Sequence, residues 1–475
     1  MQPDRTIAAA SEEDRFPAAP SARFGLLQKT AGMVPLLVFL AVYVPAAGHG
    51  FLSDDFRWIL NSHIGSLSDV WRLFHITDGF YRPLVSLTFG LDRLLFGIDP
   101  RPYGWTNVAL TLTTALLIRQ LTISLGLARG AATLAASLWL LNFHGINLSI
   151  LWVSGRTALL VGCAATACAI GVVKRRWVWA LLFLALALLS KEEAVTLPFV
   201  LASWVYLLNP GTTMARVRVA AIWLLASGVL MAGYVVLRSS TGAMTPATAP
   251  SYYQLTFAPA ALAQNALQYA DRGTTVSAIA VVLGALLLWP GKFHWPSVHR
   301  RLVQCGVIWI VGGYAITLFL PVRSSLYSVV PSIGACIAAA AVLNAFWQAA
   351  DASHRRRALL AAIVLPVCLL PVYVARTATV PLADFSTRAL NDISEATRSV
   401  PAGSTVVILD DRTTQMNLAS AFGTLINDAV EVRTGRRLNV IVEPPLPGTD
   451  VASPPCASCT SLRLRVANGR VIGAS

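Results

Sequence analysis

Long apolar runs constrain the fold of this 475-residue chain more than any other feature of its sequence. A helix needs about 20 consecutive apolar residues to cross the hydrocarbon layer of a membrane, and roughly eleven stretches approach that length. Only 13% of the residues are charged, against about 25% in ordinary soluble domains. The sequence therefore predicts an all-α polytopic membrane protein. The expected spans are 31–47, 103–122, 130–147, 150–173, 176–190, 194–209, 219–237, 274–290, 302–320, 328–347 and 358–375.

Clusters of basic residues predict the orientation of these spans. They fall in alternate loops, around 174–176, 216–218, 292–301 and 355–357. Because Lys and Arg are enriched in cytoplasmic loops, we expect these loops inside, and parity then places the N-terminus inside and the C-terminal part outside. This distribution explains much of the net charge of +14 without nucleic acid as a partner. We expect an integral protein of the cytoplasmic (inner) membrane, preceded by a disordered cytoplasmic tail, residues 1–28.

Residues 49–102 form the first external loop in this topology and are too long for a simple turn. Residues 53–76 mix apolar and polar side chains in an amphipathic pattern, which is typical of helices that lie in the membrane interface. The apolar piece 84–97 is interrupted by Asp92 and Arg93. Since a charge at the bilayer centre costs at least about 2.5 kcal/mol, we expect this piece to be a surface helix and not a span.

The composition changes after the last run, and residues 377–475 predict a small external α/β domain. Residues 404–410 and 438–442 are typical of strands, and 414–432 of a helix. Asn468-Gly469 lies between two short apolar segments, which is a strong hairpin signal.

Two adjacent carboxylates, Asp54 and Asp55, follow directly after the first apolar run. At the rim of a membrane such a group can accept a proton from an incoming hydroxyl or hold a metal ion. The alternative is a solvated start to an interfacial helix, with Ser53 or Asp54 as N-cap. His144, at the outer end of the third run, would complete a possible ligand set for Mg²⁺ or Mn²⁺. The need for a metal is left open, and no other cofactor is indicated.

Several basic residues lie at expected outer ends of spans, where the charge bias disfavours them. They are Arg82 in Tyr81-Arg82-Pro83, Lys191, Arg238 and Arg323. One reason for such cations is the binding of a lipid carrier's phosphate at headgroup depth, for which Arg offers a planar fork of donors. The alternative is snorkelling, or pairing with acids such as Glu192 and Glu193.

Arg156 lies about six residues into the fourth expected span. An arginine within a membrane almost always faces a cavity or a charged partner, so Arg156 is a further candidate for substrate binding.

Cys456 and Cys459 form a C-x-x-C sequence in the external tail. In an oxidising compartment this pair could close a small loop as a disulfide. A zinc site would need two further ligands, and none is spaced nearby.

Several motifs occur in the same order as in a known family. The first runs from Phe80-Tyr81-Arg82-Pro83-Leu84 to Phe96-Gly97-Ile98-Asp99-Pro100. The others are Asn142-Phe143-His144, Trp152-Val153-Ser154-Gly155-Arg156, Leu189-Ser190-Lys191-Glu192, and Arg323 through Leu326-Tyr327 to Pro331-Ser332-Ile333-Gly334. Together they span residues 51–334, and they resemble the O-mannosyltransferase-like branch of the C-type glycosyltransferases (GT-C).

This resemblance implies a function for residues 29–376 as a transmembrane catalytic domain. The expected reaction is inverting transfer of a sugar from a polyprenyl-phosphate-linked donor to a glycan, lipid or protein acceptor on the extracytoplasmic face. Asp54 or Asp55 would then be the general base or would orient the acceptor, and Arg323 would contact the lipid phosphate. The other substrate-binding candidates are Tyr81, Arg82, His144, Arg156, Lys191 and Tyr327.

The sequence also departs from the family pattern. Gly145 replaces a proline, no glutamate lies near Ser149, and the tetratricopeptide repeats of eukaryotic members are absent. Protein O-mannosylation is therefore not transferred by name. Two alternatives are a transporter or flippase for a lipid-linked glycan, and a non-catalytic scaffold that displays the outer domain. A transporter would favour charges deep in several spans and internal pseudo-symmetry, which the sequence lacks apart from Arg156.

Overall fold

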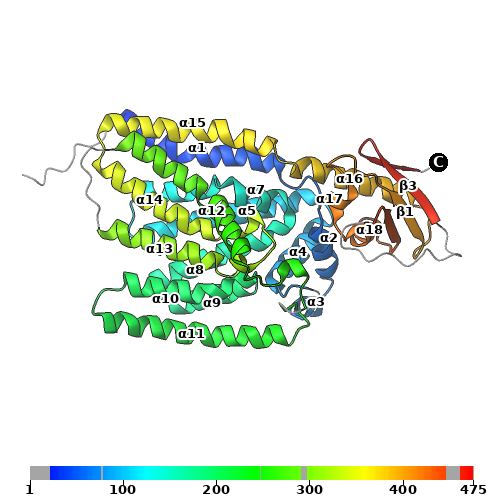
Figure 1. The fold of residues 1–475 in the computed structure, drawn as a ribbon, viewed down its shortest axis with the longest axis horizontal. Helices are drawn as coiled ribbons and strands as arrows, with labels where there is room; N and C mark the ends of the chain where they lie inside the picture. The colour runs from blue at the N-terminus through cyan, green and yellow to red at the C-terminus, as the bar shows by residue number, and fades with distance from the viewer. Residues whose placement is uncertain (1–21, 76–78, 246–247, 290–296, 446–460, 474–475) are drawn as a thin grey trace, which may run out of the picture.

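The computed structural model describes residues 22–75, 79–245, 248–289, 297–445 and 461–473, which are mostly helical. Figure 1 shows long helices side by side along the longest axis, with a small sheet at one end. We call this the domain end of the bundle, and the opposite end the basic end.

Helices occupy all eleven predicted apolar runs. They are α1 (Ala22–Ala46), α5 (Pro100–Ser124), α6 (Arg129–Leu140), α7 (Phe143–Leu151), α8 (Arg156–Val173), α9 (Trp177–Leu188), α10 (Leu197–Leu208), α11 (Thr213–Ser239), α12 (Pro259–Leu288), α13 (Ser297–Tyr314), α14 (Pro331–Ala349) and α15 (Ala352–Ala375). The third run is not one helix, because α6 and α7 meet at a bend of 60°.

By length and composition, six helices of the described chain are suited to cross a membrane, or seven if the bent pair α6 and α7 is one span. These helices indicate a membrane protein, and the mostly helical fold with a small C-terminal sheet is confirmed. The count of eleven spans stays a prediction, because α9 and α10 have only 12 residues each.

The loops with basic clusters lie together at the basic end (Figure 1). They join α8 to α9, α10 to α11, and α14 to α15, and Arg300 and Arg301 lie near the start of α13. There Arg175 donates a hydrogen bond to Asn209 Oδ1 at 2.7 Å, which ties two of these loops to each other. The positive charge is therefore concentrated at the end away from the sheet.

The first external segment folds into three helices at the domain end: α2 (Asp54–Asn61), α3 (Leu67–Arg72) and α4 (Pro83–Phe96). The expected surface helix 84–97 is confirmed as a helix, but its charges do not face outward as that expectation required. Asp92 is buried against the protein, while Leu94 and Leu95 are exposed. The charged side of α4 faces inward because an arginine that pairs with it lies there, as described below.

The C-terminal domain comprises α16 (Thr379–Ala396), β1 (Thr405–Leu409), α17 (Leu418–Phe422), α18 (Ile426–Thr434), β2 (Asn439–Glu443), β3 (Ser461–Ala467) and β4 (Arg470–Gly473). The sheet order is β2-β1-β3-β4, with β1 parallel to both neighbours and β3 antiparallel to β4. Asn468-Gly469 forms the predicted hairpin turn. The predicted helix 414–432 is two helices, because Gly423, with φ of 54°, ends the first.

The C-terminal domain and the first external segment share one hydrophobic core. Phe56 and Ile59 of α2 and Phe89 of α4 pack in the same cluster as Phe422 and Ile408. A second, larger core fills the helix bundle. The domain that the sequence sets apart as residues 377–475 is thus built onto the segment that carries the two aspartates (Figure 1).

Candidate functional site

The two neighbouring aspartates have different surroundings. Asp55 is fully buried, and both of its oxygens accept hydrogen bonds. Oδ2 accepts from the Leu52 backbone N–H at 2.8 Å, and Oδ1 accepts from the Ser154 backbone N–H at 2.6 Å and from the Ser154 hydroxyl. This carboxylate therefore ties the start of α2 to η1 (Val153–Gly155) and has no open side for a substrate.

Burial raises the pKa of Asp55 to about 7, although the hydrogen bonds from Ser154 and Leu52 lower it. Desolvation penalises the charged form more than three donors stabilise it. Such a value is often found at catalytic groups. Here the geometry assigns Asp55 to structure instead, because its carboxylate is fully buried and both oxygens accept hydrogen bonds from the protein.

The segment Trp152–Arg156 connects residues 49–102 to the helix bundle. The Trp152 indole donates to Leu52 O at 3.2 Å, and Ser154 donates to Asp55. Gly155 packs directly on the Ser149 backbone, where an added Cβ would come within 2.4 Å of Ser149 Cα. These contacts give Trp152, Ser154 and Gly155 structural roles in the protein.

Arg156 is fully buried and ion-paired with Asp92 of α4, with 2.6 Å between Nη2 and Oδ2. Its Nε donates to Asn107 Oδ1 at 2.9 Å, and Nη2 donates to Tyr103 O at 3.0 Å. It begins α8 and does not lie six residues into that helix, because the residues before it belong to α7 and η1. The expected charged partner is present, and this placement gives no support to a direct contact with substrate.

Asp54 is exposed, and no hydrogen bond or ion pair within the described residues engages its carboxylate. Partial desolvation nevertheless raises its pKa, while the positive charges of Arg82 and then Arg57 lower it. Asp54 therefore combines access, a nearby cation and increased basicity, which Asp55 does not.

Arg82, just before α4, reaches across to η2 (Glu192–Thr196). Its Nε and Nη2 both donate to Glu192 Oε2, at 3.0 and 2.8 Å. Arg238, at the end of α11, donates to Glu192 Oε1 at 3.2 Å and to Met244 O at 2.8 Å. Although burial alone raises the pKa of Glu192, Arg82 and Arg238 hold it below its ordinary value. One carboxylate thus holds two guanidinium groups side by side.

Lys191 and Glu193 form a second ion pair next to this one, with 2.6 Å between Nζ and Oε1, and both are buried. The Lys191 ammonium lies 4.7 Å from the ring centroid of Tyr327 in η5 (Ser325–Ser328). On the other side, Phe80 stacks edge-on with Tyr253 at 5.3 Å and lies under Arg82. Segments far apart in sequence therefore meet at the domain end.

We call this group the outer polar cluster. It consists of Asp54, Arg82, Lys191, Glu192, Glu193, Arg238, Tyr253 and Tyr327. Three cations (Arg82, Lys191, Arg238) face three acids (Asp54, Glu192, Glu193), so the cluster is formally neutral and gains one positive charge when Asp54 takes up a proton. Among the residues predicted from sequence, Asp54, Arg82, Lys191 and Tyr327 are brought together.

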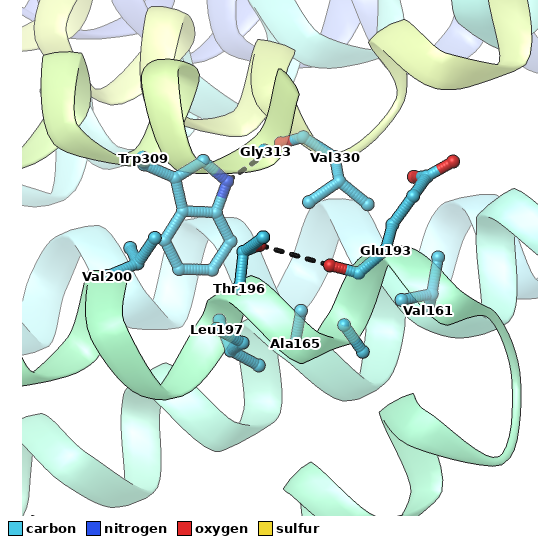
Figure 2. Close-up of a pocket in the computed structure, with 10 residues that line it drawn as sticks. Val161, Ala165, Glu193, Thr196, Leu197, Val200, Trp309, Gly313 and Val330 are labelled. Atoms are coloured by element: carbon cyan, nitrogen blue, oxygen red, sulfur yellow. Dashed lines mark hydrogen bonds between the residues drawn. The ribbon is translucent and has the colours of Figure 1, made fainter. Parts of the chain in front are cut away.

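A small cavity of about 20 Å³ lies beside the cluster, between α8, α10, α13 and α14. Figure 2 shows the carboxylate of Glu193 directed away from a mostly apolar lining that includes Trp309, Val200 and Val330. The Trp309 indole donates to Val330 O at 2.8 Å, which fixes the start of α14. An apolar pocket therefore adjoins the ionic groups.

Three predicted residues lie apart from these contacts. The Arg323 guanidinium donates to Asn265 and Gln264 of α12, and nothing in the described contacts brings it to either aspartate. His144 on α7 lies 3.9 Å from Asp271, against Phe143. The Tyr81 ring is buried in the bundle core, 6.2 Å from the Tyr234 ring.

The suggested metal ligands Asp54, Asp55 and His144 do not converge. Within the described ranges, no group of three or more His, Cys, Asp or Glu side chains is arranged to hold a metal ion. The disulfide candidates Cys456 and Cys459 lie outside the described residues.

Glu192 and Tyr253 are not among the substrate-binding residues predicted from sequence. Glu192 was expected only as an acid that pairs with a nearby cation, and the structure pairs it with Arg82, 110 positions away, and with Arg238. The available signal was the occurrence of Glu192 and Arg238 at the outer ends of apolar runs, where charges need a partner.

No protein-family model matches this sequence, and no curated protein matches it significantly. The resemblance to the C-type glycosyltransferases therefore stays a prediction from the quoted motifs.

Proposed function

We propose that this protein is a polytopic membrane glycosyltransferase that uses a polyprenyl-phosphate-linked sugar as donor. The observation that carries the proposal is the position of Asp54, an accessible carboxylate that bonds to none of the described residues and lies close enough to Arg82 for its charge to act on it. A base for the acceptor and cations for the leaving phosphate are the two requirements of the reaction.

In this proposal the acceptor hydroxyl attacks the anomeric carbon of the donor in a single inverting step. The acceptor oxygen–carbon bond forms while the carbon–oxygen bond to the phosphate breaks, and Asp54 takes the hydroxyl proton. Its raised pKa makes Asp54 a stronger base than an ordinary aspartate. Protonation of Asp54 leaves the outer polar cluster one unit positive at the moment when negative charge develops on the leaving phosphate.

Arg82 and Arg238 are the proposed phosphate contacts, in place of Arg323, whose guanidinium is bonded to Asn265 and Gln264. The two guanidinium groups are already adjacent because Glu192 holds both. We further propose that all eleven helical runs cross the cytoplasmic membrane, with the N-terminus inside and the outer polar cluster outside.

The direct test is an assay of sugar transfer with purified protein and a panel of radiolabelled polyprenyl-phosphate sugars. Asp54→Asn should lower kcat by about 10² or more, because general-base catalysis typically contributes 10² to 10⁴. Asp411→Asn, an exposed acid in the C-terminal domain, is the matched control and should keep full activity. Full activity of Asp54→Asn would remove the proposed base.

The same panel separates the alternative functions. A flippase would move the labelled lipid across liposome membranes without releasing its phosphate carrier, and Asp54→Asn need not affect this movement. A scaffold would do neither. Transfer with loss of the carrier phosphate from the sugar is the outcome that only the proposed enzyme produces.

A further inference from the structure

The residue before Asp54 has an unusual backbone. Ser53 has φ of 43° and ψ of −115°, a conformation that residues with a Cβ rarely adopt. Its backbone N–H donates to Ala421 O of α17 at 2.9 Å. A conformation of this kind persists only where surrounding contacts hold it, and such positions concentrate at functional sites. Here the holding contact comes from the C-terminal domain.

Aromatic packing reinforces this contact. The rings of Phe56 in α2 and Phe422 in α17 lie 5.7 Å apart, and both are buried. Because Phe56 is two residues after Asp54, its packing sets the rotation of the first turn of α2. The direction of the Asp54 side chain therefore depends on α17.

A second helix of the C-terminal domain holds the chain just before this point. The Ser386 hydroxyl of α16 donates to Phe51 O at 2.7 Å, and the Thr387 hydroxyl donates to His49 O at 3.2 Å. On the opposite side, Asp55 is bonded to Ser154. The segment that carries Asp54 is thus hydrogen-bonded to the C-terminal domain on one side and to η1 on the other.

We propose that the C-terminal domain is a positioning part of the candidate site: α16 and α17 hold Ser53 in its rare conformation and so direct Asp54 toward Arg82. This inference rests on the proposed function for its catalytic consequence. Phe422 is a positioning residue, since it acts through α2 and touches neither substrate nor the reacting atoms. Loss of its ring should therefore lower kcat and leave the KM for the donor nearly unchanged.

The first experiment compares Phe422→Ala with Val471→Ala in the full-length protein. Both remove buried apolar atoms from the same core, but Val471 lies in β4, away from α2. A misplacement of about 1 Å can cost up to 10² in rate, so we expect Phe422→Ala to reduce kcat at least tenfold with the donor KM within about twofold. Val471→Ala should keep kcat within about threefold of the wild type.

A second pair of variants tests the backbone of Ser53. Glycine adopts positive φ freely, whereas a β-branched residue does so at high cost. Ser53→Gly should retain at least about half of the activity, and Ser53→Val should lose at least about tenfold in kcat. Equal activity of the two variants would show that this conformation is not required.

Hydrogen–deuterium exchange over residues 51–61 gives a readout that does not depend on transfer activity. Phe422→Ala should raise deuterium uptake in this segment, and Val471→Ala should raise it only in the sheet. If wild-type protein transfers no sugar from any donor, the proposed function fails and the exchange data still decide the positioning role. Unchanged uptake over 51–61 in Phe422→Ala, or an equal rise in both variants, would overturn the inference.

Discussion

Two charged regions lie close together at the domain end, and they use their charges in opposite ways. In the buried clamp, formed by Asp55, Ser154, Arg156 and Asp92, nearly every charged oxygen meets a donor within the protein. In the outer polar cluster, Asp54 stays accessible, and its carboxylate bonds to no residue that the structure describes. Asp54 and Asp55 differ because successive residues of a helix point about 100° apart, so α2 turns one inward and the other outward.

This difference in accessibility indicates which of the two adjacent acids can react with a substrate. A buried carboxylate such as Asp55 holds several protein donors, and its removal leaves those buried donors without a partner. A carboxylate left open contributes little to stability and remains free to accept a proton. The following predictions test this division, from the largest expected effect to the smallest.

The clamp should respond most strongly to loss of one charge. Arg156→Met leaves Asp92 buried without its partner, and such changes typically cost about 3–5 kcal/mol of stability. The unfolding free energy in detergent measures the effect. The double variant Arg156→Met/Asp92→Leu should recover most of the loss, because it removes both charges. A loss below about 1 kcal/mol in the single variant would contradict the assigned role.

The pH dependence of stability should report Asp55. The pKa of Asp55 is raised to about 7 in the folded protein. Between the ordinary pKa of an aspartate and pH 7, the folded state therefore keeps a proton that the unfolded state has released. Stability should therefore be highest below pH 4 and fall as the pH rises to 7, by up to about 4 kcal/mol at 1.36 kcal/mol per unit. Unfolding measurements from pH 4 to 8 should show this slope in the wild type and a flatter one in Asp55→Asn. Equal slopes would refute the shifted pKa.

Arg82→Lys tests the fork that the outer polar cluster offers to phosphate. Lysine keeps the charge but cannot both hold Glu192 through two parallel donors and direct further donors to a phosphate, so the donor KM should rise about tenfold, equivalent to about 1.4 kcal/mol. Steady-state kinetics with varied donor concentration measures the change. Arg437→Lys, at a highly exposed position, is the control. An unchanged donor KM in Arg82→Lys would place the phosphate elsewhere.

Asp54→Asn should have the smallest effect on stability. Its carboxylate makes no bond within the described residues, so the unfolding free energy should stay within about 0.5 kcal/mol of the wild type. The same unfolding assay, read beside the transfer assay, separates folding from chemistry. Destabilisation as large as that of Asp55→Asn would show that Asp54 is also structural.

Much of the helical architecture could be predicted from sequence because it follows from local patterns. Apolar runs place helices on all eleven stretches, and the Asn468-Gly469 signal marks the hairpin. Arg82 and Lys191 were singled out by a local pattern too, since charges at the ends of apolar helices need a partner.

Contacts between distant segments could not be predicted in this way. The bridge from Glu192 to both Arg82 and Arg238 requires η2, α4 and α11 to pack together, and no local pattern reports this packing. The inward charge of α4 depends likewise on Arg156.

The sequence by itself determined that the chain forms a bundle of apolar helices with a small sheet, because hydrophobic periodicity and turn residues act over a few neighbours. Only the tertiary structure decided that Asp54 stays accessible to solvent while Asp55 is buried and hydrogen-bonded within the protein. It also decided that the C-terminal domain shares a core with the segment that carries them. The physical reason is that burial and hydrogen-bond partners are properties of packed surfaces, which form only when segments distant in the chain meet.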